Sequence, residues 1–181
     1  MLLIYIFILV MIFSSVPLLI TITKKASEGA TMRRAIEQAG GKFIPTHLFW
    51  YVGTVEKASC DFHVLYDGRI ISVKVVSLLS PRVFLSFKDS TSYEIKTFSK
   101  NESINEANVT YTKKNKRPYD FKKGLSEEYK SLPQAHVILL NTPLPARISR
   151  TVDGEKVALN RGDNTGEGEL YEVHDFIELF R

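Results

Sequence analysis

Hydrophobic and polar side chains alternate on both sides of the Asp67-Gly68 pair. Such a pair between two alternating runs predicts a β-hairpin with a two-residue turn, because both central residues of that turn need a positive φ. The predicted hairpin spans residues 60–76. Its register follows from the turn and pairs Tyr66 with Arg69, Val64 with Ile71, Phe62 with Val73, His63 with Ser72, and Asp61 with Lys74.

The two faces of this hairpin differ in polarity, because successive side chains of a strand point to opposite faces. The apolar face carries Cys60, Phe62, Val64, Ile71, Val73 and Val75. The polar face carries Asp61, His63, Ser72 and Lys74. We expect the apolar face to join the core. On the polar face, an Asp–Lys pair that faces solvent and fixes the register is one interpretation.

Other patterns predict the remaining elements of a β-rich α+β domain with a mixed sheet and two or three short helices. A short apolar run at 135–140 is typical of a buried central strand. Asp153-Gly154 predicts a hairpin over 147–160, with Val152 opposite Glu155 and Arg150 opposite Val157. The other expected elements are a helix at 27–39, an extended aromatic run at 42–52, a hairpin over 85–97, a helical turn at 120–131, and a strand followed by a turn or helix near the end.

The first 23 residues have a different pattern, since no charged side chain occurs from Leu2 to Ile22. About 20 such residues span a hydrocarbon core of about 30 Å, so the segment 1–23 is expected to be a transmembrane anchor. No Lys or Arg precedes the apolar run, which favours a retained anchor over a cleaved signal peptide. Lys24 and Lys25 follow it, and the positive-inside rule then places a single domain, residues 24–181, in the cytoplasm.

The modest net charge of +4 is unevenly distributed along the chain. Lys and Arg gather at 113–123, and acidic residues gather near the end. The basic residues overlap a polar stretch at about 99–118 that is expected to be a loop, with 109–112 at most a marginal strand. A basic stretch of this kind can bind anionic lipid or nucleic acid, or can simply be a solvated loop. The binding candidates are His63, Lys113, Lys114, Lys116 and Arg117.

The order of the expected elements from about residue 27 to 141 resembles the core of the restriction-endonuclease-like, or PD-(D/E)xK, nucleases. Asp61 on one strand and Lys74 on the next match two of that family's motif positions. The resemblance implies a divalent metal held by two carboxylates, with the lysine beside the attacking water. Ser72 stands where the family has the second carboxylate, and losing an anionic ligand weakens a site for a hard cation.

Two other chemistries are not favoured by the residue pattern. Cys60 and His63 have the spacing of zinc ligands, but residues three apart on a strand point to opposite faces. No Gly-x-Ser-x-Gly motif supports a serine hydrolase. The leading hypothesis is therefore a membrane-anchored binding module without catalysis or cofactor, with an unknown protein partner. The alternative is a metal-dependent nuclease or a nucleic-acid-binding relative of one.

Overall fold

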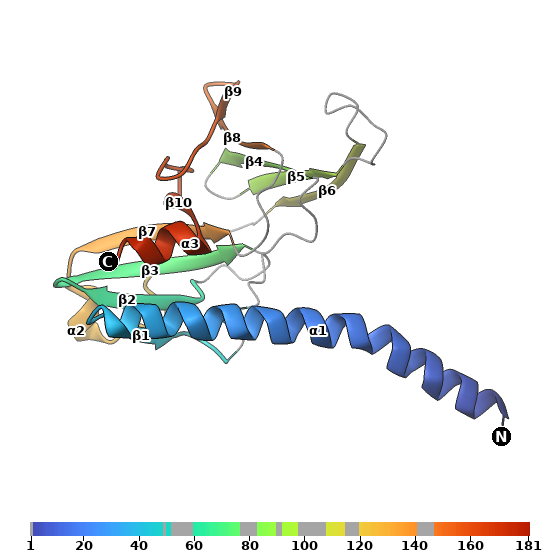
Figure 1. The fold of residues 1–181 in the computed structure, drawn as a ribbon. Helices are drawn as coiled ribbons and strands as arrows, with labels where there is room; N and C mark the ends of the chain where they lie inside the picture. Colours follow the sequence, from blue (N-terminus) through green and yellow to red (C-terminus); the bar gives the residue numbers. More distant parts are fainter. Residues whose placement is uncertain are drawn as a thin grey trace.

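The computed structural model describes residues 2–48, 50–51, 60–76, 83–89, 92–97, 108–114, 120–140 and 147–181. For most of residues 2–21 and for strands β5 and β6 it describes the backbone alone. The described chain has an α+β fold with three helices and two five-stranded sheets (Figure 1). The expected α+β class is therefore confirmed.

Helix α1, Leu2–Gln38, is one continuous helix of 37 residues. The expected short helix beginning at Ser27 is wrong in its start, because Ser27 lies inside α1 and its carbonyl accepts a hydrogen bond from Thr31 Oγ1 at 3.0 Å. The helix ends as expected at a glycine pair, where Gly40 has a φ of 85° that favours glycine. Within the part of the chain that the structure describes, no helix combines the length and apolar character needed to cross a membrane, so the anchor expected at 1–23 has no support from it.

The first sheet has the strand order β1-β2-β3-β7-β10. Strands β1, β2 and β3 are antiparallel, whereas β7 is parallel to both β3 and β10. The predicted hairpin register is confirmed from Tyr66 opposite Arg69 to Phe62 opposite Val73. The predicted strand at 135–140 is also confirmed, with β3 on one side and β10 on the other. The strand bounds are β1 Lys42–Pro45, β2 Phe62–Tyr66, β3 Arg69–Val76, β7 Gln134–Leu140 and β10 Glu169–Glu172.

The second sheet has the order β6-β5-β4-β8-β9, so the expectation of one mixed sheet was incomplete. Both further hairpins lie in it, and Val152 faces Glu155 as predicted. Within the stretch at about 99–118, which was expected to be a loop with at most a marginal strand at 109–112, residues 108–114 form the strand β6, whose backbone pairs with β5. The strand bounds are β4 Val83–Asp89, β5 Ser92–Thr97, β6 Asn108–Lys114, β8 Arg147–Val152 and β9 Glu155–Ala158.

The aromatic run after β1 is not the strand that its composition predicted. Pro45 ends the strand, and the Thr46 hydroxyl and backbone N–H turn back to bond the carbonyl of Asp61, at 2.7 and 3.0 Å. Trp50 then packs into the core as part of a turn. Proline lacks a donor for the sheet, which explains why an edge strand stops there.

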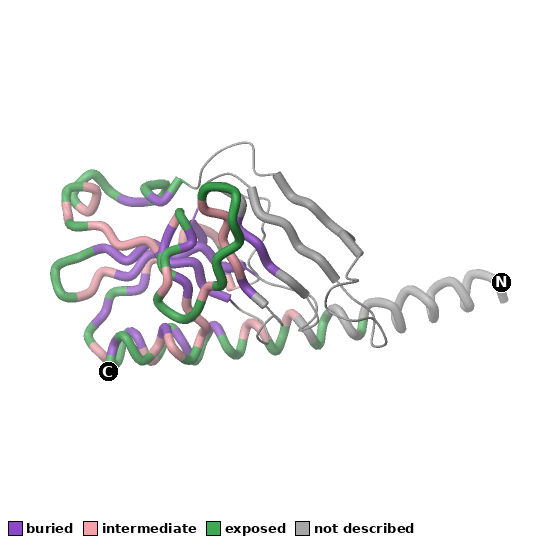
Figure 2. The backbone as a smooth tube through the Cα atoms, turned by 90° about the horizontal axis from the view of Figure 1, so that it is seen from above, coloured by how far each residue is buried: buried purple, intermediate pink, exposed green. Residues whose placement is uncertain are grey.

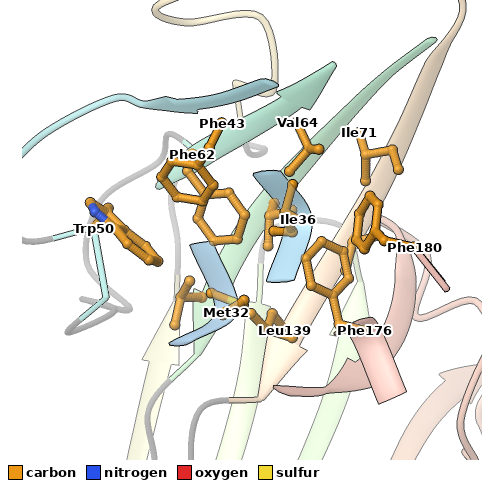
Figure 3. Close-up of a cluster of buried hydrophobic side chains, with 13 residues drawn as sticks. Met32, Ile36, Phe43, Trp50, Phe62, Val64, Ile71, Leu139, Phe176 and Phe180 are labelled. Carbon is orange, nitrogen blue, oxygen red and sulfur yellow. The ribbon is translucent and has the colours of Figure 1, made fainter. Parts of the chain in front are cut away.

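Helices α1 and α3, Val173–Glu178, pack on the same face of the first sheet. Figure 3 shows the apolar cluster between them and the strands, with Ile36 and Phe176 facing Val64, Ile71 and Leu139. Burial is concentrated in the strands of this sheet (Figure 2). The opposite face meets the second sheet in another apolar cluster, made of Cys60, Val76, Leu85, Phe87, Phe121, Ile138, Leu140, Ile148 and Leu170.

The remaining helix, α2, Glu127–Lys130, is a single short turn. It follows the turn at 120–125, which packs over the polar face of β2 and β3. Phe121 and Leu125 of that turn are buried. Two of the three helices are therefore short, as expected, while α1 is long.

Candidate functional site: a buried polar cluster

The polar face of the predicted hairpin forms one cluster with residues from neighbouring turns. We call this set the Asp61 cluster; it consists of His47, Cys60, Asp61, His63, Ser72 and Lys74. All of these except His47 have no solvent-exposed surface. The expectation of a solvent-facing polar pair is therefore wrong, because the turn at 120–125 and the second sheet cover this face.

Asp61 immediately precedes β2, and both of its carboxylate oxygens have protein partners. Oδ2 lies 3.0 Å from Lys74 Nζ and accepts the backbone N–H of Val75 at 2.8 Å. Oδ1 lies 2.9 Å from His47 Nε2. In a regular ladder a strand carbonyl would accept the N–H of Val75, but here the Asp61 carboxylate accepts it. The Asp61 carbonyl instead accepts hydrogen bonds from Thr46. Asp61 links three segments of chain.

His63 is held in one orientation by hydrogen bonds on both ring nitrogens. Nε2 lies 2.9 Å from the carbonyl oxygen of Lys123, and since a carbonyl only accepts, Nε2 carries the proton. Nδ1 then accepts the hydroxyl hydrogen of Ser72 at 2.9 Å. Burial lowers the pKa of His63, against a smaller opposing effect of the hydrogen bond to Lys123. The ring is therefore neutral near pH 7.

Cys60 lies beside His63, which the sequence interpretation placed on the opposite face. Its Sγ is 3.3 Å from His63 Nε2. The strand begins only at Phe62, so the backbone at Cys60 does not follow the strand alternation. Burial, with the Asp61 carboxylate as a smaller cause, raises the pKa of the thiol to about 12. A protonated thiol beside a neutral imidazole is the reverse of the thiolate–imidazolium pair of cysteine catalysis.

In the part of the chain that the structure describes, five of the six side chains of the Asp61 cluster are fully buried. His47 provides the side chain of the cluster nearest to solvent, with 22% of its surface exposed. Gly124 packs closely beside the cluster, where an added Cβ would lie 3.2 Å from Thr46 Cγ2 and 3.9 Å from His63 Nε2. Among the residues described, no group of three or more His, Cys, Asp or Glu side chains could hold a metal ion. Ser72 brings a hydroxyl engaged with His63 where a metal site would need a carboxylate.

The structure describes only some of the basic binding candidates. Lys113 and Lys114 are the last residues of β6, opposite Tyr93 and Ser92 of β5. Lys116 and Arg117 lie outside the described residues. Of the five candidates, His63 alone has a described side chain, and it is buried.

Two contacts of the Asp61 cluster were not indicated by the sequence. His47 comes from the turn after β1, and the Lys123 carbonyl comes from a turn 60 residues after His63. No local pattern indicates either contact, although Gly124 with its φ of 85° does mark a sharp turn. His136 lies on the neighbouring strand β7, where it pairs with Ser72 of β3. Its ring stacks on Phe121, with ring centroids 4.1 Å apart.

Comparison with known proteins adds no relative to these observations. No family model matches the chain, and neither a curated protein nor a solved structure matches it.

Proposed function

We propose that this chain is a membrane-anchored module that binds a protein partner and catalyses no reaction. One observation carries the non-catalytic part. Asp61, the strongest catalytic candidate in the sequence, is fully buried, and Lys74, Val75 and His47 engage its two carboxylate oxygens. A carboxylate that serves as a metal ligand needs an oxygen directed at an open position, and here both oxygens face protein donors.

The anchor in this proposal is the uncharged stretch Leu2–Ile22. Its length and composition support it, as does the position of this stretch in α1, whose N-terminal end projects beyond the rest of the molecule (Figure 1). Val16, Leu19 and Ile20 of this stretch have between 42% and 63% of their surface exposed. Lys24 and Lys25 follow the stretch and favour a cytoplasmic position for the domain.

Three measurements test the proposal on the full chain. The purified protein in detergent or vesicles is incubated with DNA and RNA in Mg²⁺ or Mn²⁺, and no cleavage is expected. Alkaline extraction of membranes tests the anchor, since an integral protein stays with the lipid. A reporter fused to Arg181 tests orientation, and activity restricted to the outside contradicts a cytoplasmic domain.

Binding is tested by cross-linking in intact cells, followed by purification of the anchored chain. A specific protein cross-linked to the domain supports the proposal. Recovery of the chain alone over a range of cross-linker lengths contradicts a binding role.

A second candidate is a nucleic-acid-binding relative of the nucleases that the sequence resembles. What favours it is the strand order β1-β2-β3-β7 together with the Asp61–Lys74 distance of 3.0 Å, which places both motif residues side by side. Retention of labelled DNA or RNA by the chain, weakened as salt is raised, would support this candidate. Metal-dependent cleavage lost in Asp61→Asn would overturn the non-catalytic proposal.

A further inference from the structure

The turn that follows β1 is fixed against α1 at Gly29. A Cβ added to Gly29 would lie 2.8 Å from Tyr51 Cβ and 3.1 Å from the ring of Trp50. The start of the turn is fixed as well, because the Thr46 hydroxyl lies 2.9 Å from the Cys60 carbonyl oxygen and 2.7 Å from that of Asp61. The turn therefore has a set position along the helix axis.

That position is close to the end of the apolar stretch of α1. Gly29 lies seven residues after Ile22, and a rise of 1.5 Å per residue makes this about 10 Å along the axis. Within this interval lie Lys24 and Lys25, the type of residue that extends its charge to the headgroup region. A bilayer that held Leu2–Ile22 would have its surface beside the turn.

Among the residues of the turn that the structure describes, Leu48 is an apolar side chain that faces outward. Leu48 has 80% of its surface exposed, the largest fraction among the large hydrophobic side chains described. Trp50 and Tyr51, two and three residues further along, pack toward α1 and the core (Figure 3 shows Trp50 at the edge of the apolar cluster). A single exposed leucine is common on protein surfaces. Leu48 differs from such a residue because its turn lies beside the end of the proposed anchor.

We infer that Leu48 inserts into the surface of the same bilayer that holds α1, so that this residue forms a second membrane contact. The inference rests on the proposed anchor. Its occupant is the lipid, because the turn that carries Leu48 packs on α1 at Gly29, about 10 Å along the axis from the end of the uncharged stretch. With two contacts, the orientation of the domain relative to the bilayer is fixed. With the helix as the sole contact, the domain could rotate about the helix axis.

The test uses the full chain with Leu48→Cys, reconstituted in phosphatidylcholine vesicles that contain anionic lipid. The introduced thiol is labelled with an environment-sensitive fluorophore. Native Cys60 stays unlabelled because it is buried and protonated. The matched control is Arg69→Cys, an exposed position at the other end of β2 and β3. Emission of the sole tryptophan, Trp50, verifies that both variants keep the fold.

Vesicles doped with lipid that carries a nitroxide near the headgroup are expected to quench the label at position 48 about twofold, and the label at position 69 by much less, since interfacial side chains lie within 5–10 Å of the headgroup boundary. Equal quenching at both positions overturns the inference. The inference is also overturned if the label at position 48 is shielded from water only by a second copy of the chain and not by lipid. Flotation of the labelled protein with vesicles separates the two proposals. A chain that floats with an unquenched label loses the second contact and keeps the anchor, whereas a chain that does not float loses both.

Discussion

The ammonium group of Lys74 lies 3.0 Å from the carboxylate of Asp61, and neither side chain is exposed to solvent. Taking two charges out of water costs several kcal/mol per ion, which close pairing and further hydrogen bonds must offset. Here the second carboxylate oxygen and a backbone N–H provide such bonds. The pair therefore joins β2, β3 and the turn after β1, and it is part of the framework of the domain.

Removing one partner of this pair is expected to destabilise the fold strongly. Lys74→Met leaves the Asp61 charge buried, and we expect it to lower the free energy of unfolding by about 3–5 kcal/mol. Adding Asp61→Asn to that variant should recover part of the loss. Trp50 fluorescence during urea unfolding measures both effects.

The control for this experiment is Arg33→Ala, which breaks the exposed ion pair with Glu37 on α1. Its expected cost is below about 1 kcal/mol. If Lys74→Met costs no more than Arg33→Ala, the structural role of the buried pair is contradicted.

Ser72→Asp tests whether restoring a second carboxylate creates a metal site. The position is fully buried and its hydroxyl bonds His63, so a carboxylate there is an uncompensated charge. We expect a loss of several kcal/mol in stability, larger than the about 1–3 kcal/mol for Ser72→Ala. A folded Ser72→Asp protein with Mg²⁺-dependent cleavage of DNA would show that the cluster can open, contrary to the proposal.

Acidification is expected to destabilise the domain through His63, which is buried, and His136, which is partly buried. Burial lowers the pKa of His63 and also that of His136. The unfolded chain therefore binds more protons below about pH 6.5, and stability falls as the pH drops below that value. Each group contributes up to about 1.4 kcal/mol per pH unit until its folded-state pKa is reached.

Unfolding measured at pH 7.5 and pH 5.5 checks this dependence. His63→Gln should reduce the difference between the two pH values, even if it lowers stability at both. His174→Gln changes a histidine whose side chain is 76% exposed and should keep the full difference. Equal stability of the unmodified protein at both pH values would contradict the prediction.

Cys60 is expected to be inert in the folded protein. Its thiol is buried and has a pKa of about 12, so almost no thiolate exists at pH 8. Alkylation by iodoacetamide, followed by mass spectrometry, should be slow without denaturant and fast in urea. Rapid modification of the native protein would show that the turn at 120–125 opens readily.

Gly29→Ala should destabilise the domain although alanine normally favours a helix. The intrinsic gain is about 0.5–1 kcal/mol. The new methyl group would lie 2.8 Å from Tyr51 Cβ, an atom next to the backbone that cannot rotate away. We expect the resulting overpacking to exceed the gain, for a net loss of about 1–2 kcal/mol.

The comparison for this substitution is Ala30→Gly at the adjacent exposed position of α1. It changes helix propensity alone and should cost about 1 kcal/mol. A Gly29→Ala protein more stable than the unmodified chain would contradict the close packing of the turn against α1.

The sequence by itself determined the register of the central hairpin. Asp67 and Gly68 adopt the positive φ values that a two-residue turn requires, 49° and 70°. Because the side-chain period of a strand is two, that turn alone places Asp61 beside Lys74 and His63 opposite Ser72. The hairpin around Asp153-Gly154 was predictable for the same reason, as was the strand at 134–140 from its short apolar run.

Tertiary structure decided whether the polar face is a site or an interior. The hairpin would have the same structure whether its polar face were exposed or buried. Burial of that face depends on the segments packed over it, and these are distant in the sequence. The Lys123 carbonyl reaches His63, and His47 reaches Asp61, through contacts that no local pattern encodes. Local signals fix backbone geometry over a few residues, whereas burial depends on which surfaces meet. The face that the sequence presented as open to solvent is therefore a closed part of the core.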